Sequence, residues 1–136
     1  MSHKTIVIDL DHTICTPTGG EDQAEDQNLK YSCASPDLDL IARVREYREA
    51  GFKIAIHTSR NMRTYAGDVD AIRRNTLPII IDWLDRHDVP YDEVIVGKPW
   101  CGFDGFYVDD RAIRPSEFRD LSAGEITMLL DRERAA

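Results

Sequence analysis

Four short apolar runs, separated by segments long enough to form helices, most strongly constrain how this chain can fold. The runs are TIVID (5–9), FKIAIHT (52–58), EVIVG (93–97) and GFYVDD (105–110). Strands that alternate with helices form βαβ units, and strands that are apolar throughout are buried in a parallel sheet covered on both faces. The sequence therefore predicts an α/β fold of three layers, Rossmann-like, with a central parallel sheet between helices.

Three segments between and after these runs have the pattern of helices. The first, over 35–51, has Ser35 as its N-cap, Pro36 at its first position and Gly51 as its stop. Its expected inward stripe comprises Leu38, Ile41, Val44 and Tyr47. The second spans 76–87, and its expected inward residues are Ile80, Trp83, Leu84 and His87. A capping box of Ser122 and Glu125 predicts the start of the third.

Composition limits the class of protein. The 136 residues are 42% hydrophobic and 31% charged, which favours one globular domain over residues 1–136. The net charge of −8 argues against a nucleic-acid partner, which normally requires a basic face. No apolar run is long enough to span a membrane, and nothing resembles a signal peptide, so a cytoplasmic protein without a membrane partner is expected.

The three cysteines are widely spaced and form no C-x-x-C pair. They are Cys15, Cys33 and Cys101. Free thiols in a reducing compartment are the expected state, and a disulfide or a zinc site is the alternative.

Polar residues follow each of the four apolar runs. They are Asp9 and Asp11, Thr58 and Ser59, Lys98, and Asp109 and Asp110. Because ligands of a parallel α/β sheet bind at the carboxyl ends of its strands, we expect these residues to converge on one site. A single D-x-D or G-K-P is common and carries little weight. All four groups on the same edge of one sheet are much harder to attribute to chance.

The predicted cluster has the chemistry of phosphoryl transfer. Asp9 and Asp11 are two residues apart in an extended segment, so they face the same side. Carboxylates about 4 Å apart repel by roughly 4 kcal/mol, and a cation would offset that repulsion. Hard oxygen ligands without His or Cys favour Mg²⁺. Lys98 and the hydroxyl of Thr58 would neutralise and hold a phosphate beside the metal.

The four pieces DLDHT, HTSR, GKP and VDD, in this order, resemble the four motifs of the haloacid dehalogenase-like (HAD) phosphohydrolases. The stretches TSRNMRTY (58–65) and Leu77 to Phe118 further resemble the small HAD phosphatases of capsule biosynthesis. The resemblance covers nearly the whole chain and implies a magnesium-dependent phosphatase with an HAD-like fold. It implies that Asp9 is the nucleophile that becomes an aspartyl-phosphate. Asp11 would protonate the leaving group and then activate water.

The resemblance also implies the remaining roles. Thr58 would hold the phosphoryl group, and Lys98 would neutralise it and orient Asp9. The metal ligands would be Asp9, the backbone carbonyl of Asp11, Asp109, and Asp110 directly or through water. Ser59 would also bind substrate. Arg60 and Arg111, which follow the second and fourth motifs, are predicted to bind a second anionic group of the substrate, and surface arginines paired with acids are the alternative.

The sequence departs from the family pattern at two places. His12 stands where the superfamily often has glycine, and a structural role or a contact with the leaving group are both open. The second departure is that no gap between motifs is long enough for a cap domain. A capless domain is therefore expected, with a short polar flap at about 16–33 as the local lid. Capless relatives either leave the site open to large substrates or borrow a lid from a neighbouring subunit, so an oligomer is also expected.

These inferences favour a phosphomonoester hydrolase that acts on a sugar phosphate or a related small phosphometabolite, as in surface-polysaccharide biosynthesis. A nucleotide or polynucleotide-end phosphatase is the alternative enzyme. A non-catalytic binding module of the same fold is a third alternative, although every catalytic position of the resemblance is filled in this sequence.

Overall fold

The computed structural model describes residues 4–17 and 31–135. These residues divide into two compact units, one extending to Trp100 and one beginning at Cys101, and each unit is described by itself. The prediction of a single domain over 1–136 stays a prediction. The predicted flap at 16–33 lies largely outside the described residues.

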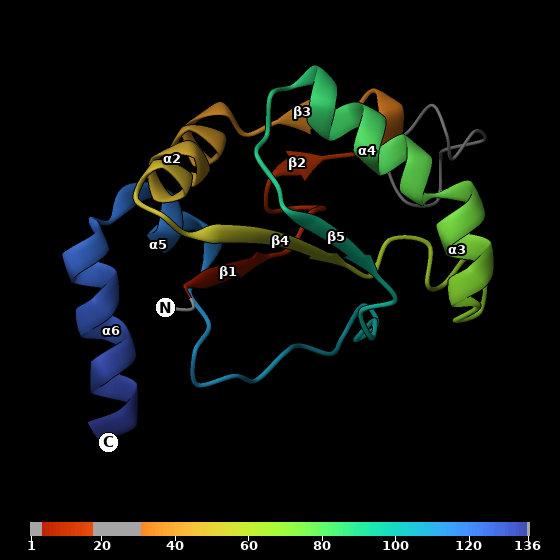
Figure 1. The fold of residues 1–136 in the computed structure, drawn as a ribbon. Coiled ribbons are helices and arrows are strands. Elements are labelled where there is room, and N and C mark those ends of the chain that lie inside the picture. Colours follow the sequence, from red (N-terminus) through yellow and green to blue (C-terminus); the bar gives the residue numbers. More distant parts are fainter. Residues whose placement is uncertain (1–3, 18–30, 136) are drawn as a thin grey trace. The chain divides into compact units, whose positions relative to one another are not determined.

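The first unit is built on a parallel sheet of three strands (Figure 1). The strands are β1 (Thr5–Ile8), β4 (Lys53–Thr58) and β5 (Glu93–Val96), in the order β1-β4-β5. In register, Ile8 lies beside Ile56, and Ile56 lies beside Val94. The predictions of an α/β fold, a parallel sheet and its first three strands are confirmed.

Three helices of this unit cover the sheet. They are α2 (Leu38–Glu49), α3 (Val69–Asn75) and α4 (Leu77–Arg86), of which α2 contacts β4 and the other two contact β5. Ile8, Ile54 and Ile56 are buried, while Val7 and Ile95, whose side chains alternate with buried ones, are 60% and 39% exposed. Within residues 4–100 most of the core therefore lies on one face of the sheet, with Ala55 buried on the other.

The predicted start of the first helix is wrong. Ser35 and Pro36 form the short strand β3 (Ser35–Pro36), which pairs antiparallel with β2 (Cys15–Thr16). The helix begins two residues later because the side chain of Asp37 accepts a hydrogen bond from the backbone N–H of Leu40 at 3.0 Å. As a result Leu38 is 69% exposed and Leu40 is buried in its place.

The end of the first helix and the buried face of the second helix agree with the predictions. Gly51 follows the C-cap of α2 at a φ of +99°, a conformation that favours glycine. Ile80, Trp83 and Leu84 are buried on α4 as predicted, while His87 is half-buried at its C-cap. Helix α3 was not predicted, because its seven residues include too few apolar positions to show a periodicity.

The second unit contains α5 (Pro115–Asp120) and α6 (Ala123–Ala135). The predicted capping box is confirmed, since Ser122 Oγ accepts from the N–H of Glu125 at 3.2 Å and Glu125 Oε1 accepts from the N–H of Ser122 at 3.0 Å. The predicted strand over 105–110 is wrong. Among the described residues it has no ladder partner, and Phe106 and Val108 are 79% and 88% exposed. Apolar composition alone does not supply the backbone partner that a strand requires.

Two broader expectations also bear on the described part of the chain. Cys15, Cys33 and Cys101 are free, so the prediction of unpaired thiols is confirmed. None of the described helices combines the length and the apolar character that crossing a membrane requires.

Candidate functional site

Asp9 lies where β1 ends and the chain turns away from the sheet. Its carboxylate Oδ1 is 3.6 Å from Lys98 Nζ, and its Oδ2 accepts a hydrogen bond from the hydroxyl of Thr13 at 3.1 Å. The side chain of Asp9 is 36% exposed. The structure therefore brings together Asp9 and Lys98, as predicted. It adds Thr13, a residue four positions after Asp9 that no sequence motif indicated.

Backbone geometry determines the position of Lys98. The N–H of Lys98 donates to the carbonyl of Thr58 at 3.1 Å, which continues the pairing of β4 and β5 past the last paired residues. Gly97 precedes it at a φ of +89°, and a Cβ there would lie 3.1 Å from Val69 Cγ2. Glycine is favoured here because any other residue would be strained at this φ and its Cβ would crowd the side chain of Val69. The ends of β4 and β5 therefore place Lys98 directly beside Thr58.

Asp11 is held by Arg60 in a two-pronged ion pair. Arg60 Nε donates to Asp11 Oδ2 at 2.9 Å, and Nη2 donates to Oδ1 at 2.6 Å. The side chains of Arg60 and Asp11 are 1% and 19% exposed. Short, charge-assisted, bidentate bonds of this kind are strong and fix the plane of the carboxylate.

The environment of Arg60 is unusual for an arginine. Its guanidinium lies over the ring of Tyr31, 4.1 Å from the ring centroid, and Nη2 also lies 3.8 Å from Cys15 Sγ. Burial lowers the pKa of Arg60, but the hydrogen bonds that Arg60 donates to Asp11 and the negative charge of Asp11 outweigh burial and raise that pKa overall. The cation is therefore retained in the protein interior by one specific carboxylate.

Cys15 lies next to this pair and is buried. Its Sγ lies 3.5 Å from Asp11 Oδ1, as a donor to that oxygen. Burial and then the negative charge of Asp11 raise the pKa of the Cys15 thiol to about 12, although Arg60 acts in the opposite direction. The thiol is therefore protonated near neutral pH and is a poor nucleophile.

Thr58 and Ser59 form the turn after β4. Thr58 is 1% exposed, and its Oγ1 accepts from the backbone N–H of Arg60 at 3.0 Å. That bond shapes the turn that directs Arg60 toward Asp11, and it leaves the hydroxyl proton of Thr58 to donate elsewhere. Ser59 is half-buried. The prediction that both residues bind a phosphate stays a prediction.

His12 occupies the tight turn after Asp11, at a φ of +63°. Its N–H donates to the carbonyl of Cys15 at 2.7 Å, and its side chain is exposed. This left-handed conformation favours glycine, so a histidine in this turn is strained. The structure therefore gives His12 a backbone role in the turn.

The turn makes a prediction about His12. His12→Gly is expected to change the free energy of unfolding by less than about 1 kcal/mol, because relief of the left-handed strain offsets the extra entropy of the unfolded chain. His12→Val is expected to destabilise by roughly 1–2 kcal/mol, since a β-branched residue fits this conformation poorly. Urea unfolding of the three proteins checks the order. Equal stability of the glycine and valine variants would contradict it.

His57 lies inside the HTSR motif and was not predicted to be a site residue. Burial lowers its pKa, the charge of Lys98 lowers it further, and Asp9 acts in the opposite direction. His57 is therefore electrostatically coupled to the same two residues that meet at the end of β1. The sequence feature that could have indicated His57 is its position immediately before Thr58.

The lowered pKa of His57 predicts a pH dependence of stability. The unfolded chain binds a proton near pH 6.5, whereas folded His57 binds one only at lower pH, so its contribution is present above about pH 6.5 and is lost as the pH falls through the folded pKa. We expect His57→Gln to reduce the loss of stability between about pH 7.5 and pH 5. Urea unfolding of the wild type and His57→Gln at both pH values measures this. An unchanged loss in His57→Gln would refute it.

The remaining predicted site residues lie in the second unit. Asp109 Oδ1 accepts from the N–H of Arg111 at 2.8 Å, and Asp110 Oδ2 lies 3.5 Å from Nε of Arg134. Asp109, Asp110 and Arg111 are all exposed. Their predicted roles in metal and substrate binding stay predictions.

The donor set of the first unit fits Mg²⁺ in its chemistry. Asp9 offers a partly exposed carboxylate, and the predicted carbonyl ligand of Asp11 is a hard oxygen. The carboxylate of Asp11 is already paired with Arg60, so its backbone carbonyl is the more suitable ligand. Within residues 4–17 and 31–135, no three His, Cys, Asp or Glu side chains gather as a metal site.

Together the fold and these contacts define an α/β protein with a charged cluster at the carboxyl ends of its parallel strands. The chain is 51% identical to an MCSG target protein from Vibrio cholerae whose crystal structure it matches with a TM-score of 0.84. The match covers 96% of this chain and 98% of that one, so the chain belongs to the same family as the Vibrio cholerae protein. Neither the family models nor the curated proteins gave a match.

Proposed function

We propose that this protein is a magnesium-dependent phosphomonoester hydrolase of the HAD type, which acts through an aspartyl-phosphate. The observation that carries the proposal is the pairing of Asp9 with Lys98, 3.6 Å apart at the carboxyl end of β1. A partly exposed carboxylate beside an ammonium group suits attack on a phosphate, because the lysine attracts the dianion and offsets the charge on both partners.

The surrounding contacts support a defined orientation of the nucleophile. Thr13 holds one oxygen of Asp9, and Lys98 lies beside the other. Thr58 is fixed in the turn next to Lys98, and its hydroxyl proton is free of the bond that Oγ1 accepts from Arg60. In the proposed reaction Asp9 attacks phosphorus, Lys98 and Thr58 hold the phosphoryl oxygens, and Asp11 exchanges protons with the leaving group and with water.

Mg²⁺, when bound, would supply positive charge to the phosphoryl group. Asp9 and the carbonyl of Asp11 would hold it, and the roles of Asp109 and Asp110 as ligands rest on the sequence resemblance alone. As part of the same proposal, the whole chain forms one capless HAD-like domain with a Rossmann-like sheet and helices on both of its faces. Arg111 would bind a further anionic group of a small substrate such as a sugar phosphate.

A substrate panel tests the proposal. Purified protein with Mg²⁺ is expected to release phosphate from 4-nitrophenyl phosphate and from at least one small phosphometabolite, and chelation of the metal is expected to stop the release. Preference for 3′-phosphorylated oligonucleotides would replace the substrate class while leaving the chemistry intact. Absence of release from every substrate, with wild type and Asp9→Asn indistinguishable, would overturn the hydrolase and favour a binding module.

A further inference from the structure

Arg60 has contacts that the proposed reaction does not by itself require. Its Nε and Nη2 both donate to the carboxylate of Asp11, and one face of the guanidinium lies against the ring of Tyr31. The turn bond from the N–H of Arg60 to Thr58 Oγ1 fixes the backbone from which the side chain extends. Both the backbone and the head group of Arg60 are thus held in one geometry.

This geometry leaves Arg60 little scope to contact a substrate. Its side chain is 1% exposed, and two of its three nitrogens are engaged by Asp11. The third, Nη1, is buried and has no hydrogen-bond partner in the described part of the chain. A phosphate or carboxylate of a substrate would have to displace Tyr31 or Asp11 to reach the guanidinium.

Stability alone does not account for the pair either. Removing an arginine and a carboxylate from water is costly, and well-packed apolar residues at such positions are often as stable or more so. Nη1 adds a buried donor without a described partner, which is a further cost. What the pair does provide is orientation, because a bidentate fork fixes both oxygens of Asp11.

We propose that Arg60 is a positioning residue that holds the Asp11 carboxylate toward the water that hydrolyses the aspartyl-phosphate. This inference rests on the proposed function. In that step the water oxygen bonds to phosphorus as its proton passes to Asp11. The bond from phosphorus to the Asp9 oxygen breaks, and its electron pair returns to the Asp9 carboxylate. Inorganic phosphate leaves, and the proton on Asp11 replaces the one given to the leaving group in the first step.

Arg60→Lys tests the role, because lysine keeps the charge and loses the fork. With 4-nitrophenyl phosphate, formation of the aspartyl-phosphate needs little proton donation from Asp11. A slower hydrolysis of the aspartyl-phosphate would therefore limit kcat. We expect kcat to fall about 10²-fold and KM to fall with it, leaving kcat/KM nearly unchanged. Rapid mixing should show a burst of one nitrophenol per active site, and acid quenching should trap phosphorylated Asp9.

Other outcomes overturn the inference in distinguishable ways. A raised KM with unchanged kcat would show that Arg60 contacts substrate. Parallel losses in kcat and kcat/KM without a burst would show a structural role only. In both cases the wild-type enzyme is active and the proposed function stands. A wild-type protein that releases no phosphate from any substrate would overturn the proposed function, and this inference with it.

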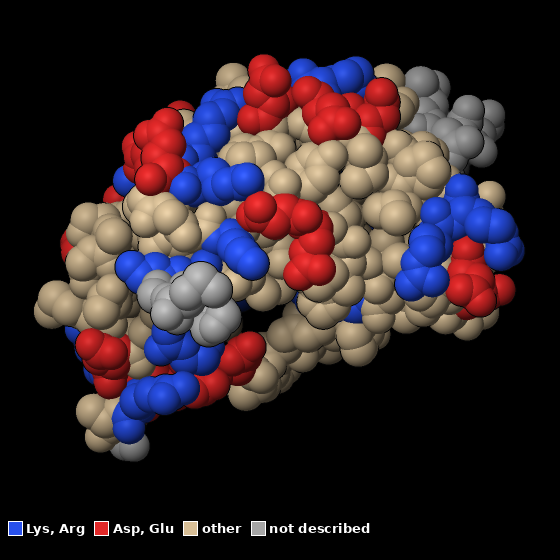
Figure 2. Space-filling model, viewed as in Figure 1, with Lys and Arg blue, Asp and Glu red and all other residues tan. Residues whose placement is uncertain are grey.

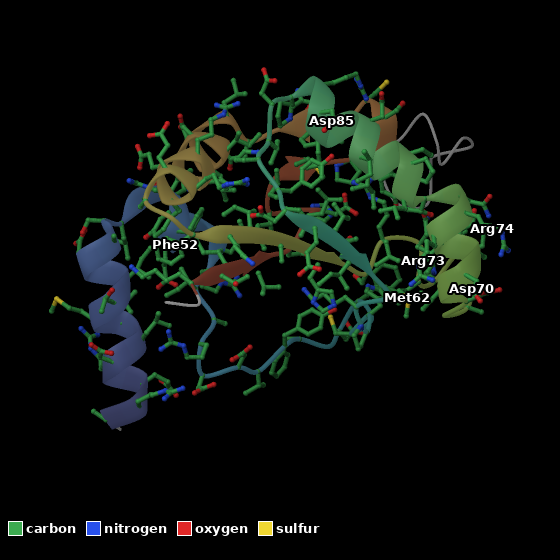
Figure 3. The ribbon with its side chains drawn as sticks, in the orientation of Figure 1. Phe52, Met62, Asp70, Arg73, Arg74 and Asp85 are labelled. Carbon is green, nitrogen blue, oxygen red and sulfur yellow. The ribbon has the colours of Figure 1, made fainter. Side chains whose placement is uncertain are left out.

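A second measurement tests the pair without activity. Asp11→Asn and Arg60→Met are each expected to lower Tm by roughly 10–20 °C, since each leaves a buried partner uncompensated. The double variant should lower Tm by clearly less than the sum of the two single shifts. The matched control is Asp70 with Arg73 on α3, an exposed pair at 3.3 Å that Figure 3 labels.

That control region carries acidic and basic side chains together on the surface, as the right-hand side of Figure 2 shows. Asp70→Asn and Arg73→Gln should therefore each shift Tm by less than about 2 °C and should add in the double variant. Additive shifts at Asp11 and Arg60, as in this control, would show that the two side chains are not coupled and would overturn the positioning role. If Arg60→Met does not fold, Arg60→Lys takes its place in the cycle.

Discussion

Asp9→Asn is expected to abolish phosphate release, with a fall of roughly 10⁴–10⁶-fold in kcat. An amide cannot attack phosphorus as the carboxylate does, so no aspartyl-phosphate forms. Asparagine has nearly the same shape and keeps an oxygen that can accept the bond from Thr13. The fold should therefore be preserved, because the carboxylate is partly exposed and its ion pair with Lys98 contributes little to stability.

Phosphate release with Mg²⁺ and thermal unfolding measure the two halves of this expectation. Asp39→Asn is the matched control, since Asp39 is an exposed acid in the first turn of α2 and should retain full activity. Intact-mass measurement checks that asparagine has not deamidated back to aspartate. Activity of Asp9→Asn within tenfold of the wild type would exclude Asp9 as the nucleophile.

Trp83→Ala is expected to lower the free energy of unfolding by about 3–5 kcal/mol. Trp83 is 1% exposed on α4, its ring lies 4.3 Å from that of His87, and its indole N–H donates to the carbonyl of Ala34 at 3.0 Å. Truncation would leave a large cavity and a buried carbonyl without its donor. It would also release one of the contacts that join α4 to the segment before β3.

Urea unfolding measures this loss. Trp83→Phe, which refills most of the space but cannot donate the hydrogen bond, should cost roughly 1–3 kcal/mol. Trp100→Ala is the control, because Trp100 is 38% exposed and should cost less than either. A loss below about 1 kcal/mol for Trp83→Ala would mean that this side chain does not support the core.

The parts of the fold that the sequence predicts best are those with a strong local signal. Three strands, the inward face of α4 and the capping box of α6 all depend on patterns within a few residues. The two errors are different in kind. Ser35 and Pro36 look like a helix start, but pairing with Cys15 and Thr16 recruits them into a strand. The segment 105–110 has the composition of a strand without a described partner.

The candidate site also has one part that the sequence could predict and one part that it could not. Convergence of Asp9, Thr58 and Lys98 follows from the rule that parallel strands share a carboxyl edge, so the sequence could predict it. The partnership of Arg60 with Asp11 joins side chains that are 49 residues apart in the sequence. No pattern within a single sequence specifies such a contact, which is why Arg60 was predicted to bind substrate.

The backbone bond from the N–H of Lys98 to the carbonyl of Thr58 has a consequence for how the site tolerates sequence change. It makes the position of the ammonium group a property of strand alignment rather than of local side-chain packing. Substitutions around the lysine other than at Gly97 should be tolerated, whereas one residue inserted or deleted in β5 would move Gly97 or Pro99 into its place. Length, more than identity, is therefore what this stretch of chain must preserve.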